Sequence, residues 1–340
     1  MRKFCSLALV FVFVVAFNAK AQYEPPPKIK KEFDAAIKKV GDYLKEAEED
    51  TVYVADKFAA SKKEADKVKK RWDDCKANAT EAQKKNATKN LNAITNFGNS
   101  ITSQLDSQTK GVSELKKQKT SVENDAKNAT DFDEYFAATK AASALQATSS
   151  SVKKQADQTF FMWKEYDVVV ENLFDIVVSV ENNEQDEGQT SNEPETLIDT
   201  FSTTAATTSD TFTIITEAFE GDVVGLADAY SEVMEAWYMA LYMDPESISE
   251  EEGKMLSQIT NEIWAIQQYV DSSVETLYGM ESMIESSIMM ALEIEDPWEQ
   301  MEAFALLASN SDNETYDSLS GIIAHAYERK AEALLILGVE

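Results

Sequence analysis

Apolar residues recur every three or four positions along most of the chain, and this period constrains the fold more than any other feature. From Phe33 to Ala82, two columns of a heptad repeat hold fifteen positions, of which only Thr51 and Ser61 are polar. Lys, Glu and Asp fill most of the positions between them. Because a 3-4 spacing keeps one stripe facing a partner helix, the pattern predicts one long amphipathic helix over this range.

The stripe continues in segments that are longer than ordinary globular helices. After a phase slip near Asn86 it resumes at 91–126 and, after a turn near 128–131, at 136–180. Further helical spacing covers 197–219 and 223–243, with a break expected at Gly221, and then 255–294, 298–307 and 316–337. No segment alternates as a strand would. Ten Gly and six Pro in 340 residues also argue against a turn-rich β fold.

The predicted fold class is therefore all-α, with long amphipathic helices in an antiparallel bundle or coiled-coil-like rod, followed by an acidic helical bundle. The distribution of charge also divides the chain into a first, near-neutral part and a second, acidic part. Residues 22–164 hold 26 basic and 22 acidic residues, whereas 165–340 hold three basic residues against 39 acidic ones. We predict a near-neutral long-helix region at 22–180, an acidic linker at 181–194 and an acidic, Met-rich helical domain at 195–340.

Residues 1–21 are typical of a signal peptide. Arg2 and Lys3 precede an uncharged run from Phe4 to Phe17, and residues 19–21 read Ala-Lys-Ala, a cleavage pattern. The alternative is an uncleaved N-terminal anchor. No later apolar run is long enough to span a membrane, so we expect a secreted, extracellular protein. The acidic half disfavours nucleic acid and anionic membrane surfaces as partners and favours a basic extracellular protein.

Candidate catalytic chemistry is sparse. The chain has a single histidine, His325, which could act as a base or metal ligand but is more typical of a helix-packing or surface residue. Acidic clusters at 181–187 and 250–252 lack the spacing of a calcium loop and are interpreted as solvated faces. Phosphate-binding, dinucleotide-binding and nucleophile-elbow motifs do not occur. We therefore predict no enzyme activity, no cofactor and no metal.

Nine of the eleven methionines lie between Met234 and Met301, among several aromatic residues. Such side chains fill helical cores, which is the interpretation we favour. They also form adaptable apolar pockets, so a carrier of an apolar small molecule or lipid is the alternative function. The candidate ligand-binding residues are Met234, Trp237, Met243, Trp264, Met280 and Trp298.

Cys75 is the one thiol left after removal of residues 1–21, and it falls on the apolar stripe. It could face its own copy in a parallel homodimer and form an interchain disulfide, or it could be buried within one chain. Four sequons, at Asn78, Asn86, Asn128 and Asn313, are candidate N-glycosylation sites. Together these features predict a secreted, non-catalytic structural or interaction protein, with the apolar carrier as the alternative.

Overall fold

The computed structural model describes residues 23–184, 188, 195–244, 247–309 and 317–339. Within these ranges the chain is helical and contains no strand, which confirms the all-α fold class. The predicted signal peptide at 1–21 and most of the predicted linker at 181–194 lie outside the described residues. The elements are α2 (Pro27–Cys75), η1 (Lys76–Asn78), α3 (Glu81–Asn128), α4 (Phe132–Glu181), α5 (Glu195–Met243), α6 (Glu250–Leu292), α7 (Pro297–Ser309) and α8 (Asp317–Ile336).

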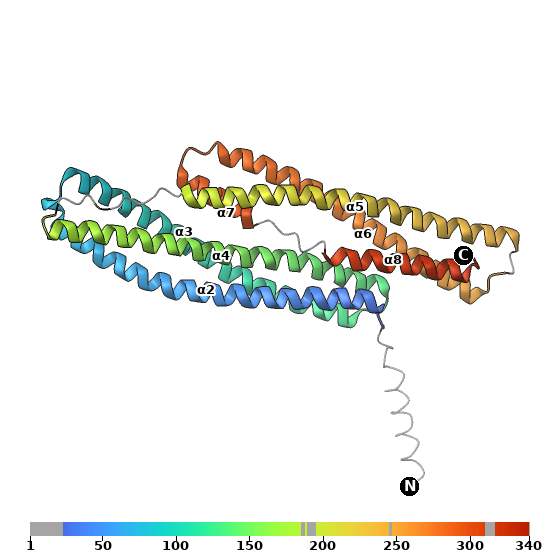
Figure 1. Cartoon of the computed structure of the whole chain (residues 1–340). Helices are drawn as coiled ribbons and strands as arrows, with labels where there is room; N and C mark the ends of the chain where they lie inside the picture. The colour runs from blue at the N-terminus through green and yellow to red at the C-terminus, as the bar shows by residue number, and fades with distance from the viewer. Residues whose placement is uncertain (1–22, 185–187, 189–194, 245–246, 310–316, 340) are drawn as a thin grey trace, which may run out of the picture.

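The first three long helices form a bundle in which α2 and α4 run parallel and α3 returns between their ends (Figure 1). Near the start of α2, the ring of Phe33 lies 5.5 Å from that of Tyr135 at the start of α4. At the other end, Arg71 pairs with Glu181, the last residue of α4. At 1.5 Å per residue, the 49 residues of α2 extend about 75 Å.

The predicted heptad stripe is the buried face of α2. Fourteen of its fifteen positions are buried, and Ala82 is half-buried. The two polar members are hydrogen-bonded, as burial requires. Thr51 donates to the carbonyl of Ala47 at 2.6 Å. Ser61 donates to Asp167 at 2.7 Å and accepts from the Trp163 indole at 3.1 Å.

Two details of the predicted helices are wrong. The first helix does not run to Ala82: α2 ends at Cys75, and α3 begins after Thr80. Thr80 and Gln83 form a capping box there, which satisfies free backbone amides at the new helix start. Because Ala79 remains buried in the turn, the apolar period runs on across the break. The expected break at Gly221 is also absent, since α5 is continuous through that residue.

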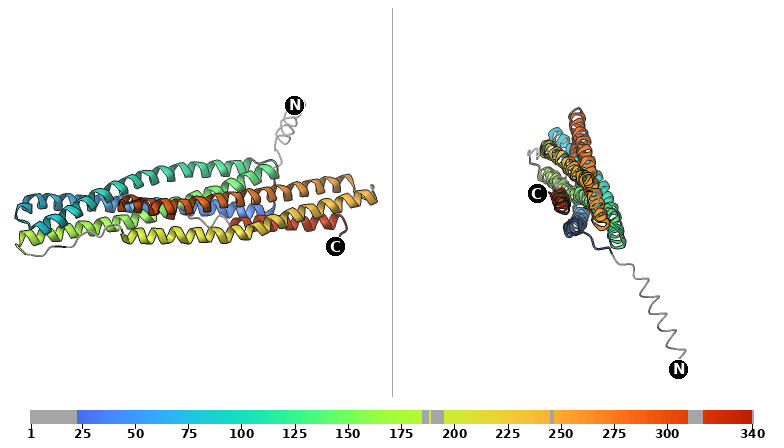
Figure 2. Two further views of the ribbon diagram at one scale, coloured as in Figure 1. Left: turned by 90° about the horizontal axis from the view of Figure 1, so that it is seen from above. Right: turned by 90° about the vertical axis from the view of Figure 1, so that its right-hand side faces the viewer.

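The second part of the chain folds as an α5–α6 hairpin, with α8 packed along α6 and α7 turned back across α5. Figure 1 shows that this hairpin lies beside the first bundle and extends past the starts of α2 and α4. Seen from above, all the long helices follow one common axis (Figure 2). The molecule is therefore a rod built from two overlapping bundles.

The two largest buried clusters join the halves that charge separates in the sequence. One holds Phe97, Tyr166 and Leu173 from the first bundle together with Phe201 and Phe304 from the second. The other combines side chains from the starts of α2 and α4 with side chains of α5, α6 and α8. Both halves therefore depend on shared apolar packing, in addition to the packing within each bundle.

Candidate functional site

The residues predicted to form one ligand pocket are spread along the second bundle. Trp237 packs beside a small buried cluster near the outer end of α5, and Met234 lies one turn earlier and is half-buried. Met243, the last residue of α5, is largely exposed, as is Trp264 on α6. None of these four side chains lines the cavity described below.

The remaining two candidates lie elsewhere. Trp298, at the start of α7, packs edge-on against Phe97 of α3 with ring centroids 4.4 Å apart, which is an aromatic core contact. Met280 of α6 lines a cavity. Of the six predicted ligand-binding residues, Met280 is therefore the one that the structure places at a candidate site.

This cavity has a volume of about 870 Å³ and lies between α4 and α6, bounded by α7 and by the start of α8. Its volume is within the range of small-molecule pockets in proteins. Lining side chains from α6 and α7 include Met280, Met283, Ile284 and Leu306. The site therefore draws on both charge halves of the chain, whereas the sequence placed a ligand pocket within the acidic half alone.

Beyond Lys140, the wall on α4 is built from Ala141, Ala144, Ala147, Thr148 and Ser151. The three alanines are spaced three residues apart, which places them on one helix face. Their side chains end at the Cβ atom and leave space between α4 and α6. Sequence reasoning missed this wall, although the repeated Ala spacing beside Ser and Thr was a readable signal.

Large apolar side chains at the cavity remain in contact with solvent. Met283 is 69% exposed and Leu306 is 57% exposed, although both line the cavity. Exposed apolar groups that gather in one place are typical of ligand or partner sites. The cavity is thus an open apolar channel along the rod.

Lys140 of α4 is the one charged side chain among the described residues that line this cavity. Its Nζ atom lies 5.2 Å from the ring centroid of Phe136 and 5.5 Å from that of Tyr269. Burial raises the pKa of the Tyr269 hydroxyl, so the ring meets the ammonium group as a neutral phenol. Two aromatic rings therefore hold a cation in place at the cavity.

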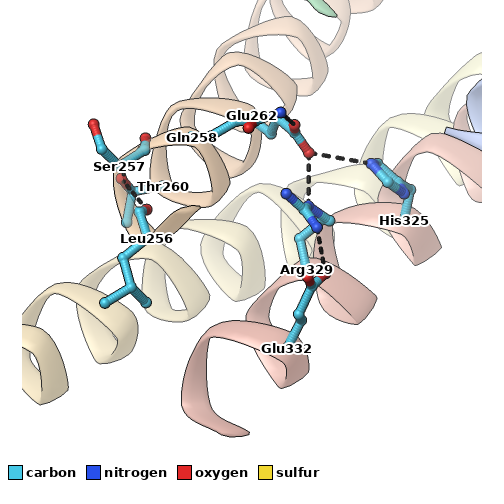
Figure 3. A network of polar contacts seen from close by, with 8 residues as sticks. All are labelled: Leu256, Ser257, Gln258, Thr260, Glu262, His325, Arg329 and Glu332. Atoms are coloured by element: carbon cyan, nitrogen blue, oxygen red, sulfur yellow. Dashed lines mark hydrogen bonds and ion pairs between the residues drawn. The ribbon is translucent and has the colours of Figure 1, made fainter. Parts of the chain in front are cut away.

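Figure 3 shows a separate polar cluster where α6 and α8 meet. Glu262 is 3% exposed, and Arg329 donates from Nε to its carboxylate at 2.7 Å. Gln258 donates to the other carboxylate oxygen at 3.1 Å, and His325 Nε2 lies 3.5 Å from the oxygen that Arg329 binds. Arg329 also pairs with Glu332. The cluster ties two helices together through a buried carboxylate.

His325 is buried, and its ring stacks on Phe132 of α4 at 6.4 Å between centroids. This position matches the helix-packing interpretation of the single histidine. In the part of the chain that the structure describes, no group of three or more His, Cys, Asp or Glu side chains could hold a metal ion. The predicted acidic face at 250–252 begins α6, where Glu252 forms a capping box with Ser249. The hydrogen bonds from Ser249 lower the pKa of Glu252.

Cys75 is buried in the cluster that α2, α3 and α4 share. Burial raises the pKa of its thiol, which makes the sulfur a weak nucleophile. This position fits the alternative in which the stripe packs within one chain. The interchain disulfide stays a prediction, and it would require the sulfur to leave this cluster.

The candidate glycosylation sites differ in exposure. Asn78 and Asn128 are exposed at the two turns that flank α3, whereas Asn86 is half-buried within α3. Asn313 lies outside the described residues. The turn positions give a glycan free access to solvent, so Asn78 and Asn128 are the better placed of the predicted sites.

Basic side chains do little to neutralise the acidic half. Lys254 pairs with Glu250 at 2.7 Å on the same helix, and Arg329 and Lys330 pair with acidic residues of α6, α8 and α5. All three basic residues of 165–340 are therefore already engaged within that half. These three basic residues face 39 acidic residues in the same half, so most of its negative charge is not compensated from within.

None of the described helices is both long enough and apolar enough to cross a membrane. Comparison with known proteins gave no match to a family model, to a curated protein or to a solved structure.

Proposed function

We propose that this protein is a secreted, non-catalytic interaction protein whose acidic helices bind a basic extracellular partner. The observation that carries this proposal is the engagement of Lys254, Arg329 and Lys330 by acids of their own half. The three ion pairs leave residues 165–340 with a large uncompensated negative charge. Such a surface attracts cationic proteins and accelerates their association.

The shape of the rod supports the same function. Helices of 43 to 50 residues present their carboxylates along an extended surface, where many weak contacts act together. Exposed ion pairs contribute little one by one, so affinity would come from their number. Binding should therefore weaken steeply with added salt, which screens exposed charges over about 8–10 Å at 0.1–0.15 M.

A direct test measures binding of lysozyme, as a basic probe protein, by biolayer interferometry at increasing sodium chloride concentrations. The acidic variant replaces three exposed carboxylates of α5 with amides, namely Glu217→Gln, Asp228→Asn and Glu235→Gln. We expect its affinity to fall severalfold at low salt and the salt dependence to become shallower.

The matched control replaces three exposed carboxylates of the near-neutral bundle, with Glu46→Gln, Asp56→Asn and Asp106→Asn. It removes the same number of charges, so it should change the affinity little. Affinity that is insensitive to salt, or equal losses in the two variants, would overturn the proposal that the acidic half is the binding surface.

A second candidate function is a carrier of an apolar small molecule or lipid. The open cavity between α4 and α6 favours it, because its walls are largely apolar and its volume suits such a ligand. Extraction of the purified protein with organic solvent, followed by mass spectrometry, tests this function. We expect a lipid-like molecule in stoichiometric amount, and its absence together with no uptake of added lipid would exclude the carrier.

A further inference from the structure

The cavity between α4 and α6 is elongated along the rod. On α4 its lining residues run from Lys140 to Ser151, and on α6 from Tyr269 to Ser287. At 1.5 Å per residue these stretches correspond to about 16 Å and about 27 Å. Because Lys140 lies against Tyr269, the cation sits at the end of the channel where both stretches begin. An extended chain of one long fatty acid fits such a channel better than a compact molecule does.

The walls change in character along this channel. Beyond Lys140 they combine apolar side chains, namely alanines of α4, methionines of α6 and leucines of α7, with six hydroxyl side chains: Thr148, Ser151, Ser272, Ser273, Thr276 and Ser287. Alanine leaves space for a ligand, and methionine adapts its shape to a flexible chain. The apolar part of these walls suits a hydrocarbon without branches or rings, and Lys140 is the one charged group among the described lining residues.

Charge at the mouth of the channel selects the head group. Lys140 is held by Phe136 and Tyr269, and no carboxylate among the described residues pairs with it. This is an unusual position for a lysine in a protein with a formal charge of −29. An ammonium group beside an apolar channel is complementary to a ligand with an anionic end and an apolar body.

We propose that the cavity binds a long-chain carboxylate, with its head group at Lys140 and its hydrocarbon chain along the alanine wall of α4. This inference rests on the carrier function proposed above and specifies its ligand class. Covering Met283 and Leu306 with hydrocarbon removes their apolar surface from water, which supplies the driving force for the chain. The ion pair with Lys140 then distinguishes a carboxylate from an uncharged lipid of the same length.

The test compares oleate with oleyl alcohol, its uncharged counterpart, by isothermal titration of the full-length purified protein after removal of lipid. Lys140→Met keeps the apolar stem of the side chain and removes the charge. We expect the preference for oleate over oleyl alcohol to fall by about ten- to a hundredfold in this variant. An unchanged preference would overturn the assignment of the head group to Lys140, while leaving the carrier function in place.

A second variant tests the position of the chain. Ala144 is exposed to the cavity and outside the buried core, so Ala144→Trp fills the channel without disturbing packing. We expect it to abolish binding of both ligands, whereas Ala60→Trp, at an exposed position of α2, should bind as the original protein does. Retained binding in Ala144→Trp would overturn the proposed site. Failure of the original protein to bind either ligand would overturn the carrier function itself.

Discussion

The buried ion pair between α6 and α8 gives the sharpest test of the packing described above. In Arg329→Met, the Glu262 carboxylate is left in a position that is 3% exposed. Removing one partner of a buried pair costs about 3–5 kcal/mol, because the other charge loses its compensation. In Glu262→Gln the remaining Arg329 is 18% exposed and keeps Glu332, so the expected cost is smaller, about 1–3 kcal/mol. The arginine variant should therefore be the less stable of the two.

Urea unfolding followed by circular dichroism at pH 7 measures these costs.

A matched control breaks an exposed pair. Arg71 and Glu181 are each 39% exposed, so Arg71→Met should cost much less than Arg329→Met. The double variant Glu262→Leu with Arg329→Met should be more stable than Arg329→Met alone, because it leaves no buried charge. If Arg329→Met costs no more than Arg71→Met, the Glu262 carboxylate is not buried as described.

Three further predictions concern the first bundle. Burial raises the pKa of Tyr166 to about 12 from 10.0, so the stability that its neutral hydroxyl contributes is present below pH 10 and is lost as the pH rises toward 12. In urea titrations, Tyr166→Phe should reduce this alkaline loss of stability by up to about 2–3 kcal/mol. An unchanged dependence of stability on pH in the variant would contradict this prediction. Thr80→Ala removes the capping box with Gln83 and should cost about 1 kcal/mol by the same assay, whereas Thr80→Ser keeps both the cap and the sequon and should cost much less. Cys75 should react with a thiol reagent only after denaturation, since it is buried; a dimer band on a non-reducing gel that disappears with reductant would instead support the interchain disulfide.

The sequence alone predicted the helices and the buried face of α2. Apart from Thr51 and Ser61, the heptad positions along that face repeat apolar side chains, so the period is encoded locally and can be read without knowing the partner. The apolar period was less informative where an apolar residue lies in a turn. Ala79 keeps the period while the chain leaves the helix, so the end of α2 at Cys75 was not visible in the pattern. At Gly221 the sequence indicated a helix break that does not exist. A glycine lowers helix propensity without necessarily ending a helix, and α5 continues through it.

Tertiary structure decided which faces meet and what remains open between them. The parallel arrangement of α2 and α4, and the clusters that join the two charge halves, depend on pairings between residues far apart in the chain. The candidate cavity depends on such long-range pairings too. Lys140 and the alanines of α4 form a cavity wall only because Tyr269 and Met280 of α6 lie opposite them. A local apolar period determines that a helix buries one face. It carries no information on which distant helix covers that face, because that choice is made by the summed packing of the whole rod.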